Sequence, residues 1–304
     1  MCHKYDLFKV INLILNNYQP MMSATVNNDR QSSNYSEYTA KLSTGQLIII
    51  GGAEDKEGDC TILREFVRRS GGREAKIVVM TTATGSPEEV GEMYRRIFND
   101  MGVDVVDLVD TKSREDASNS EDLELIENST GVFFTGGDQS RITDLLKDTE
   151  IDDLLHKKLI RGLVIGGTSA GAAMMSDVMI VEGEGETNPR IDCVTLEPGM
   201  GFLPQVAIDQ HFSQRGRLGR FISALMQQSA VLGFGIDENT AIAVDGDKLE
   251  VIGEGAVTII DVSEVGYTNL KESLHDESLA ICGAKLHILP HGHQFDLKQR
   301  KCIH

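Results

Sequence analysis

Short, continuously apolar runs rich in branched residues recur along the chain from residue 46 onward. None of them alternates with polar residues, so each is typical of a strand buried on both faces of a parallel sheet. The runs predict strands over residues 47–50, 76–80, 103–108, 132–135, 163–165 and 231–236.

Stretches with the apolar spacing of an amphipathic helix lie between these strands. The spacing is clear at Met93, Ile97 and Met101, where an apolar side chain returns every fourth residue. Helical stretches are likewise predicted around residues 62–67 and over residues 120–127, 140–147 and 151–161. Apolar strands that alternate with helices predict an α/β fold with a mostly parallel sheet covered on both faces.

The pattern changes after residue 236, where one strand follows another without a helix between them. Strands are predicted over residues 240–244, 248–252, 256–261 and 285–289, with a turn at 245–247. We expect these strands to extend the same sheet in antiparallel fashion. Residues 23–43 are rich in Ser, Asn, Thr and Tyr without an apolar period, so residues 1–44 are predicted to be a mobile extension, followed by a single catalytic domain over 45–304.

Composition narrows the classes of function. The 304 residues are 40% hydrophobic and 25% charged, which is typical of a globular protein, and the formal charge of −18 argues against a nucleic-acid partner. The five cysteines include no CxxC pair, which favours free thiols in a reducing compartment. No run is long and apolar enough for a membrane span, and the apolar stretch at 7–15 is a weak signal peptide, so we expect a cytoplasmic protein.

The sequence Gly-Thr-Ser-Ala-Gly at residues 167–171 stands where a predicted strand meets a predicted helix. A sharp strand-to-helix turn exposes the Ser169 hydroxyl, and the flanking glycines permit a close approach of the backbone. The alternative is a tight turn or phosphate loop that merely contains a serine. A Walker loop is excluded because no Gly-Lys-Ser/Thr follows.

A nucleophilic serine needs a base and an acid that orients the base. His211 directly follows an apolar run at 206–210, which predicts that it lies at the carboxyl edge of the sheet. Glu238 follows another apolar strand and is the candidate acid, with Asp237 as its competitor. The alternatives are a partly buried structural histidine and solvated turn carboxylates.

The predicted strand over 132–135 ends in a Gly-Gly turn, in which backbone N–H groups are not obstructed by side chains. Either Gly137 or Asp138 is therefore predicted to complete an oxyanion hole together with Ala170. Asp138 could also serve as the N-cap of the next helix. A similar turn at 51–55 is expected to line the pocket.

Arg215, Arg217 and Arg220 lie within nine residues of the candidate base. Apolar residues of the predicted helix, including Leu218, place Arg217 and Arg220 side by side on its flank. Arginine suits bidentate capture of carboxylates, whereas the alternative is a solvated basic helix face. Three histidines at 287, 291 and 293 have no set of Cys or carboxylates around them, so we predict no metal site.

Five motifs, at residues 49–56, 134–142, 166–172, 209–220 and 237–241, together resemble cyanophycinase, an S51-type serine peptidase family related to peptidase E. The resemblance covers residues 46–297. It implies a three-layer αβα sandwich and hydrolysis of cyanophycin, a poly-aspartate with arginine on each side-chain carboxyl, to β-Asp-Arg dipeptides. It also implies a homodimer without metal or cofactor and a triad of Ser169, His211 and Glu238.

The resemblance further implies a set of residues that bind the substrate. They are Gln139, Asp209, Gln210, Arg215, Arg217, Arg220 and Asn239. The substrate carries both carboxylates and guanidinium groups, so a pocket with cations and anions side by side fits its chemistry.

Three other functions are alternatives for this sequence. In an α/β-hydrolase esterase the histidine comes last, here His287, but the better candidate histidine precedes the acid. A peptidase E-like α-aspartyl dipeptidase on the same fold is the nearer alternative, which the arginine cluster disfavours. The third is a non-catalytic binding protein.

Overall fold

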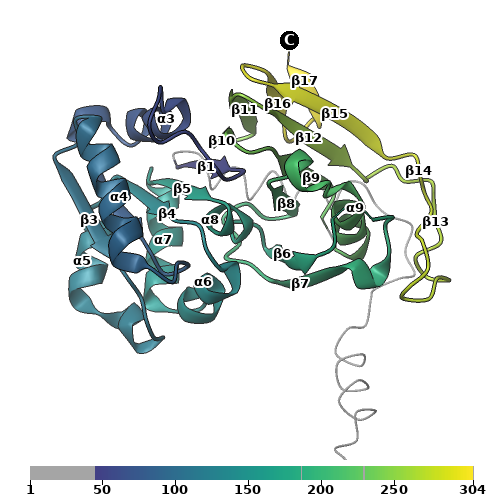
Figure 1. The fold of residues 1–304 in the computed structure, drawn as a ribbon, viewed down its shortest axis with the longest axis horizontal. Coiled ribbons are helices and arrows are strands. Elements are labelled where there is room, and N and C mark those ends of the chain that lie inside the picture. The colour runs from purple at the N-terminus through teal and green to yellow at the C-terminus, as the bar shows by residue number, and fades with distance from the viewer. Residues whose placement is uncertain (1–44, 186, 229, 304) are drawn as a thin grey trace, which may run out of the picture.

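A computed structural model describes residues 45–185, 187–228 and 230–303, and Figure 1 shows their arrangement. The extension predicted over residues 1–44 lies outside the described residues. None of the helices in the described ranges is long and apolar enough to cross a membrane.

Five parallel strands form one side of a nine-stranded sheet. Their order is β1 (Gln46–Ile50), β5 (Val164–Thr168), β4 (Gly131–Phe134), β2 (Lys76–Met80) and, at the edge of the sheet, β3 (Val105–Val109). Every residue of β4 and β5 is buried, as the continuous apolar runs predict. β2 begins and ends at the predicted residues.

Helices cover both faces of this sheet. On one face lie α3 (Thr61–Arg69) and α4 (Pro87–Asp100), and on the other lie α5 (Ser120–Asn128), α6 (Gln139–Leu146), α7 (Glu150–Ile160) and α8 (Ala170–Ala173). Successive residues of β1 point to opposite faces, so Ile48 belongs to the same core cluster as Phe66 of α3, while Ile49 belongs to the cluster that includes Leu155 of α7. The predicted αβα architecture is confirmed.

Four antiparallel strands extend the sheet beyond β1. They are β10 (Thr240–Asp245), β11 (Lys248–Gly253), β16 (Gln294–Asp296) and β17 (Lys301–Ile303). β10 and β11 extend the sheet as predicted, whereas β16 and β17 were not predicted as strands. Gly246 has a φ of 57° in the turn between β10 and β11, a conformation that glycine adopts without strain.

The remaining C-terminal strands do not join this sheet, and here the prediction is wrong. A second sheet has the order β15 (Lys285–Pro290), β12 (Ala256–Asp261), β9 (Leu232–Ile236) and β8 (Val206–Gln210). Its inner face packs into the larger core through residues such as Phe234, and its outer face is covered by α9 (Leu218–Gln227) through Phe221 and Leu225. β9 is therefore buried on both faces without belonging to the main sheet.

Several smaller elements were not predicted. A hairpin of β6 (Val178–Gly183) and β7 (Val194–Pro198) follows α8, and β13 (Tyr267–Thr268) pairs with β14 (Ile281–Cys282). Short 3-10 helices occupy Gly72–Glu74, Glu115–Ser118, Ile191–Cys193 and Ser213–Arg215.

Candidate active site

Ser169 stands at the sharp turn between β5 and α8. Its backbone has φ 52° and ψ −108°, a conformation that is rare for a residue with a side chain. A Cβ atom on Gly167 would lie 2.2 Å from the Gly171 carbonyl oxygen, and one on Gly171 would lie 2.5 Å from the Phe134 oxygen. Both flanking positions therefore require glycine, as expected for a nucleophile elbow.

His211 lies against the serine. Its Nε2 is 3.0 Å from Ser169 Oγ, within hydrogen-bond range. The His211 N–H donates to the Gly51 carbonyl over 2.8 Å, and a Cβ on Gly52 would lie 2.3 Å from the imidazole Cε1. The turn after β1 thus packs directly on the imidazole ring and holds it in place.

The two candidate acids occupy different environments. His211 Nδ1 is 2.6 Å from Glu238 Oε1, whereas the Asp237 carboxylate accepts hydrogen bonds from the Ser213 N–H (3.0 Å) and the Ala256 N–H (3.2 Å). Asp237 thus joins the end of β9 to the neighbouring loop and to β12. Glu238 is the carboxylate that contacts the imidazole.

The surroundings of His211 keep its imidazole neutral. Burial lowers the pKa of His211 from its usual value near 6.5, and the nearby charges of Arg215 and Arg217 act in the same direction. The Glu238 carboxylate opposes them by stabilising the imidazolium. A neutral imidazole at neutral pH has a free lone pair to accept the serine proton.

The Gly-Gly turn after β4 lies next to the serine, because a Cβ atom on Gly136 would lie 3.5 Å from Ser169 Cβ. Within the described residues the N–H groups of Gly137 and Ala170 donate no hydrogen bond, so both are free for an oxyanion. The Asp138 N–H donates to the Ala83 carbonyl over 2.9 Å and is not free. The Asp138 side chain accepts from the Ser140 N–H and caps α6, which was the alternative role.

The three arginines lie in two different environments. Arg220 donates from Nε and Nη2 to the Asp209 carboxylate over 2.9 and 2.5 Å, and Arg217 donates from Nη1 over 3.2 Å. The side chains of Asp209, Arg217 and Arg220 form a buried cluster, whereas Arg215 is exposed. Burial lowers the pKa of Arg217 to about 10, which leaves it charged at neutral pH.

The predicted apolar face of this helix is wrong at one position. Leu218, expected on that face, is 48% exposed, whereas other apolar residues of the helix, such as Phe221, are buried. Arg220, expected on the flank, is 4% exposed. The buried carboxylate of Asp209 accounts for the difference, because it compensates the cost of burying the guanidinium groups. A role of Arg217 and Arg220 in substrate binding stays a prediction.

Two of the other residues predicted to bind substrate, Gln139 and Asn239, also have structural partners. Gln139 donates from Nε2 to the carbonyl groups of Ile180 and Val181 on β6, and Asn239 Oδ1 accepts from the Asp55 N–H over 2.8 Å. Gln210 is buried, and its Oε1 has no hydrogen-bond partner among the described residues. Their contacts with a substrate are untested.

Sequence reasoning placed the turn at 51–55 in the pocket but gave Glu54 no role. The Glu54 carboxylate is buried and accepts a hydrogen bond from Thr168 Oγ1, the residue before the serine, over 2.5 Å. Tyr94 and Lys56 also contact it. The only sequence signal was a charged residue two positions after the Gly-Gly pair that follows a buried strand.

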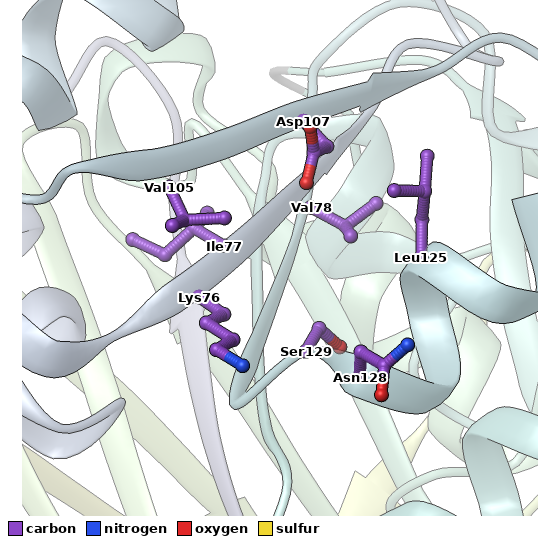
Figure 2. A pocket seen from close by; sticks show the side chains of 8 residues that line it. All are labelled: Lys76, Ile77, Val78, Val105, Asp107, Leu125, Asn128 and Ser129. Atoms are coloured by element: carbon purple, nitrogen blue, oxygen red, sulfur yellow. The ribbon is translucent and has the colours of Figure 1, made fainter.

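A groove of about 400 Å³ is separate from this site. It is lined by the beginnings of β2 and β3 and by the end of α5, including Lys76, Val105 and Asn128 (Figure 2). Those are the amino ends of parallel strands, whereas Ser169 follows the carboxyl end of β5. Among the described residues, no group of three or more His, Cys, Asp or Glu side chains is placed to hold a metal ion.

A sequence model of peptidase family S51 matches residues 47–252. The chain belongs to this family. An S51 peptidase is a hydrolase, so the protein is an enzyme. The match spans the elbow, His211 and Glu238, and ends within β11.

Relatives and a solved structure agree with this family. The chain is 39% identical over 267 residues to a cyanophycinase of Trichormus variabilis, covering 87% of this chain and 90% of the relative. It is 41% identical over 265 residues to a cyanophycinase of Synechococcus elongatus, covering 85% and 82%. The structure of a peptidase from an acI-B1 Actinobacterium shares the fold, with a TM-score of 0.62, 20% identity, and coverage of 83% and 97%.

Proposed function

We propose that this S51 peptidase hydrolyses cyanophycin and releases β-Asp-Arg dipeptides, acting as an exopeptidase through Ser169, His211 and Glu238. The observation that carries the proposal is the continuous chain of contacts, 3.0 Å from Ser169 Oγ to His211 Nε2 and 2.6 Å from His211 Nδ1 to Glu238 Oε1. The S51 family membership and the similarity to two cyanophycinases support the substrate.

In the proposed reaction, His211 Nε2 takes the proton of Ser169 as Oγ attacks the carbonyl carbon of an aspartate backbone peptide bond. The oxyanion that forms is stabilised by the free N–H groups of Gly137 and Ala170. His211 then gives its proton to the leaving amine, and the C–N bond breaks. Water, deprotonated by His211, hydrolyses the resulting ester and regenerates the serine.

Glu238 has two parts in this cycle. Its contact with Nδ1 favours the tautomer in which Nε2 carries the lone pair, and its charge stabilises the imidazolium that forms during each proton transfer. Glu238 is itself oriented, because its N–H donates to Gln214 Oε1 over 3.0 Å.

The polar groups around the triad fit a substrate of mixed charge. We assign the exposed Arg215 to a carboxylate of the substrate, since its N–H bonds to the His211 carbonyl and places it beside the base. We also assign the side-chain amides of Gln139 and Asn239 to the substrate.

Incubation with insoluble cyanophycin tests the proposal. The wild-type protein should release soluble material with the mass of β-Asp-Arg, and Ser169→Ala should lose activity by several orders of magnitude, since it removes the nucleophile. More than a few per cent of residual activity in Ser169→Ala would exclude this mechanism.

Comparison of three substrates tests specificity. Cyanophycin should be cleaved much faster than plain poly-aspartate, which lacks the arginine groups that bind remote parts of the pocket. Faster turnover of an α-aspartyl dipeptide would instead indicate a peptidase E-like activity. Binding of cyanophycin without any turnover would indicate a binding protein.

We also propose a homodimer in the cytoplasm. The homodimer follows from the family resemblance, and light scattering measures it. The unpaired cysteines of the described residues, Cys60, Cys193, Cys282 and Cys302, are compatible with a reducing compartment, and localisation of a tagged chain in its native cell tests that part.

A further inference from the structure

The turn that follows β1 contacts the elements carrying all three triad residues. The Ser169 N–H donates to the Ile50 carbonyl over 3.1 Å, and the His211 N–H donates to Gly51 over 2.8 Å. The Asn239 N–H, next to Glu238, donates to the Gly52 carbonyl over 2.9 Å. The position of this turn therefore affects the nucleophile, the base and the acid together.

Glu54 anchors this turn to the nucleophile elbow. Its side chain is fully buried, and its Oε2 accepts the Thr168 hydroxyl over 2.5 Å. Its Oε1 accepts the Tyr94 hydroxyl from α4 and lies 2.8 Å from Lys56 Nζ. One carboxylate thus connects the turn after β1, the end of β5 and helix α4.

The groups around the Glu54 carboxylate are protonated and act as hydrogen-bond donors to it. Burial and the adjacent Glu54 carboxylate raise the pKa of Tyr94 well above its usual value, so the phenol stays protonated and donates. A buried carboxylate is stable only when its oxygens are paired, and here three donors satisfy both oxygens. The arrangement resists displacement of any one member.

The elbow needs such an anchor because its backbone conformation is unfavourable. Ser169, directly after Thr168, has positive φ, a state that costs free energy and persists only where its surroundings hold it. The Thr168 hydroxyl lies next to this residue in sequence, and its hydrogen bond to Glu54 fixes the backbone there.

We propose that Glu54 is a positioning residue for hydrolysis, which acts through Thr168 to hold Ser169 in line with His211. The inference rests on the proposed function, because it takes Ser169 as the nucleophile. Displacement of a reacting group by about 1 Å from a distant change can lower the rate by about 10²-fold.

Two conservative substitutions test this role. Thr168→Val keeps the shape of the side chain and removes its hydroxyl, and Glu54→Gln turns one acceptor oxygen into a donor group. Each should lower kcat on cyanophycin by about 10- to 100-fold, with KM within about twofold, because binding groups are retained while the attack geometry is lost. Thr168→Ser, which keeps the hydroxyl, should retain activity close to wild type.

A second readout separates positioning from folding. The rate at which a small fluorophosphonate labels Ser169 should fall in parallel with kcat, measured well below the Tm of each variant. The double variant should be no slower than the slower single variant, since both changes break one contact. Glu65→Gln is the matched control, because Glu65 pairs with Arg68 and Arg69 on α3, and it should label at the wild-type rate.

The outcomes distinguish the two proposals. If Thr168→Val and Glu54→Gln lower only Tm and label at the wild-type rate, the positioning role is excluded while the triad stands. If wild-type Ser169 is not labelled at all, or Ser169→Ala still cleaves cyanophycin, the proposed function itself fails.

Discussion

Arg220→Met should destabilise the folded protein, although its position in sequence suggests a substrate contact. Methionine keeps most of the apolar stem and removes the guanidinium. Arg220 makes two hydrogen bonds to Asp209, which is completely buried, and Arg217 makes one. The substitution therefore leaves a buried carboxylate with only one of its two cationic partners.

The size of the effect follows from this geometry. Removing one partner of a buried ion pair costs about 3–5 kcal/mol, and the remaining bond from Arg217 favours the lower end, about 3 kcal/mol. For a domain of about 150–250 residues each kcal/mol lowers Tm by about 2–4 °C, so the expected decrease is about 6–12 °C.

Thermal unfolding of wild type, Arg220→Met and Arg215→Met measures this decrease in Tm. Arg215 is exposed, so its substitution should change the free energy of unfolding by no more than about 0.5 kcal/mol. Arg215→Met should instead raise KM for cyanophycin. A Tm of Arg220→Met equal to that of wild type, with loss of cyanophycin turnover alone, would refute the reasoning and make Arg220 a direct substrate contact.

Three further predictions concern the triad. Glu238→Gln should lower kcat steeply, by about 10²-fold or more, because the amide cannot stabilise imidazolium, whereas Asp237→Asn should mainly lower Tm. Kinetics and thermal unfolding of both variants test this, and a large loss of kcat in Asp237→Asn alone would make Asp237 the triad acid. Fluorophosphonate labelling of Ser169 should rise with pH through an apparent pKa below 6.5, since the neutral form of His211 reacts and burial depresses its pKa. Arg215→Met should raise the pKa of His211 by removing a positive neighbour, so the rise in labelling rate should move to higher pH. An unchanged pH profile would show that the Arg215 charge does not affect the imidazole. Gly52→Ala should slow labelling by at least about tenfold, because its Cβ would overlap the imidazole and displace it; an alanine variant labelled at the wild-type rate would show that the ring moves aside freely.

Local sequence was enough for the parallel core and for the elbow. Continuous apolar runs indicate strands that must be buried on both faces, and β1, β2, β4 and β5 are such strands. The elbow could be predicted from sequence because its glycines are required by a contact between near neighbours, that of Gly167 with the backbone at residue 171. Both signals depend on neighbours along the chain.

The assignment of strands to sheets depended on tertiary structure. β9 has the same apolar pattern as the central strands, yet it pairs with β8 and β12. An apolar pattern reports burial, but it carries no information about which strand supplies the hydrogen bonds.

The polar residues of the site show the same limit. Sequence alone left Glu238 and Asp237 as alternatives, and the contacts that separate them reach Ser213 and Ala256, 24 and 19 residues away from Asp237. It also did not predict that Arg220 is buried, because the helical period reports the apolar face and not the position of Asp209. Whether a charge is buried depends on the partner that compensates it, and that partner is brought close only by the folded chain.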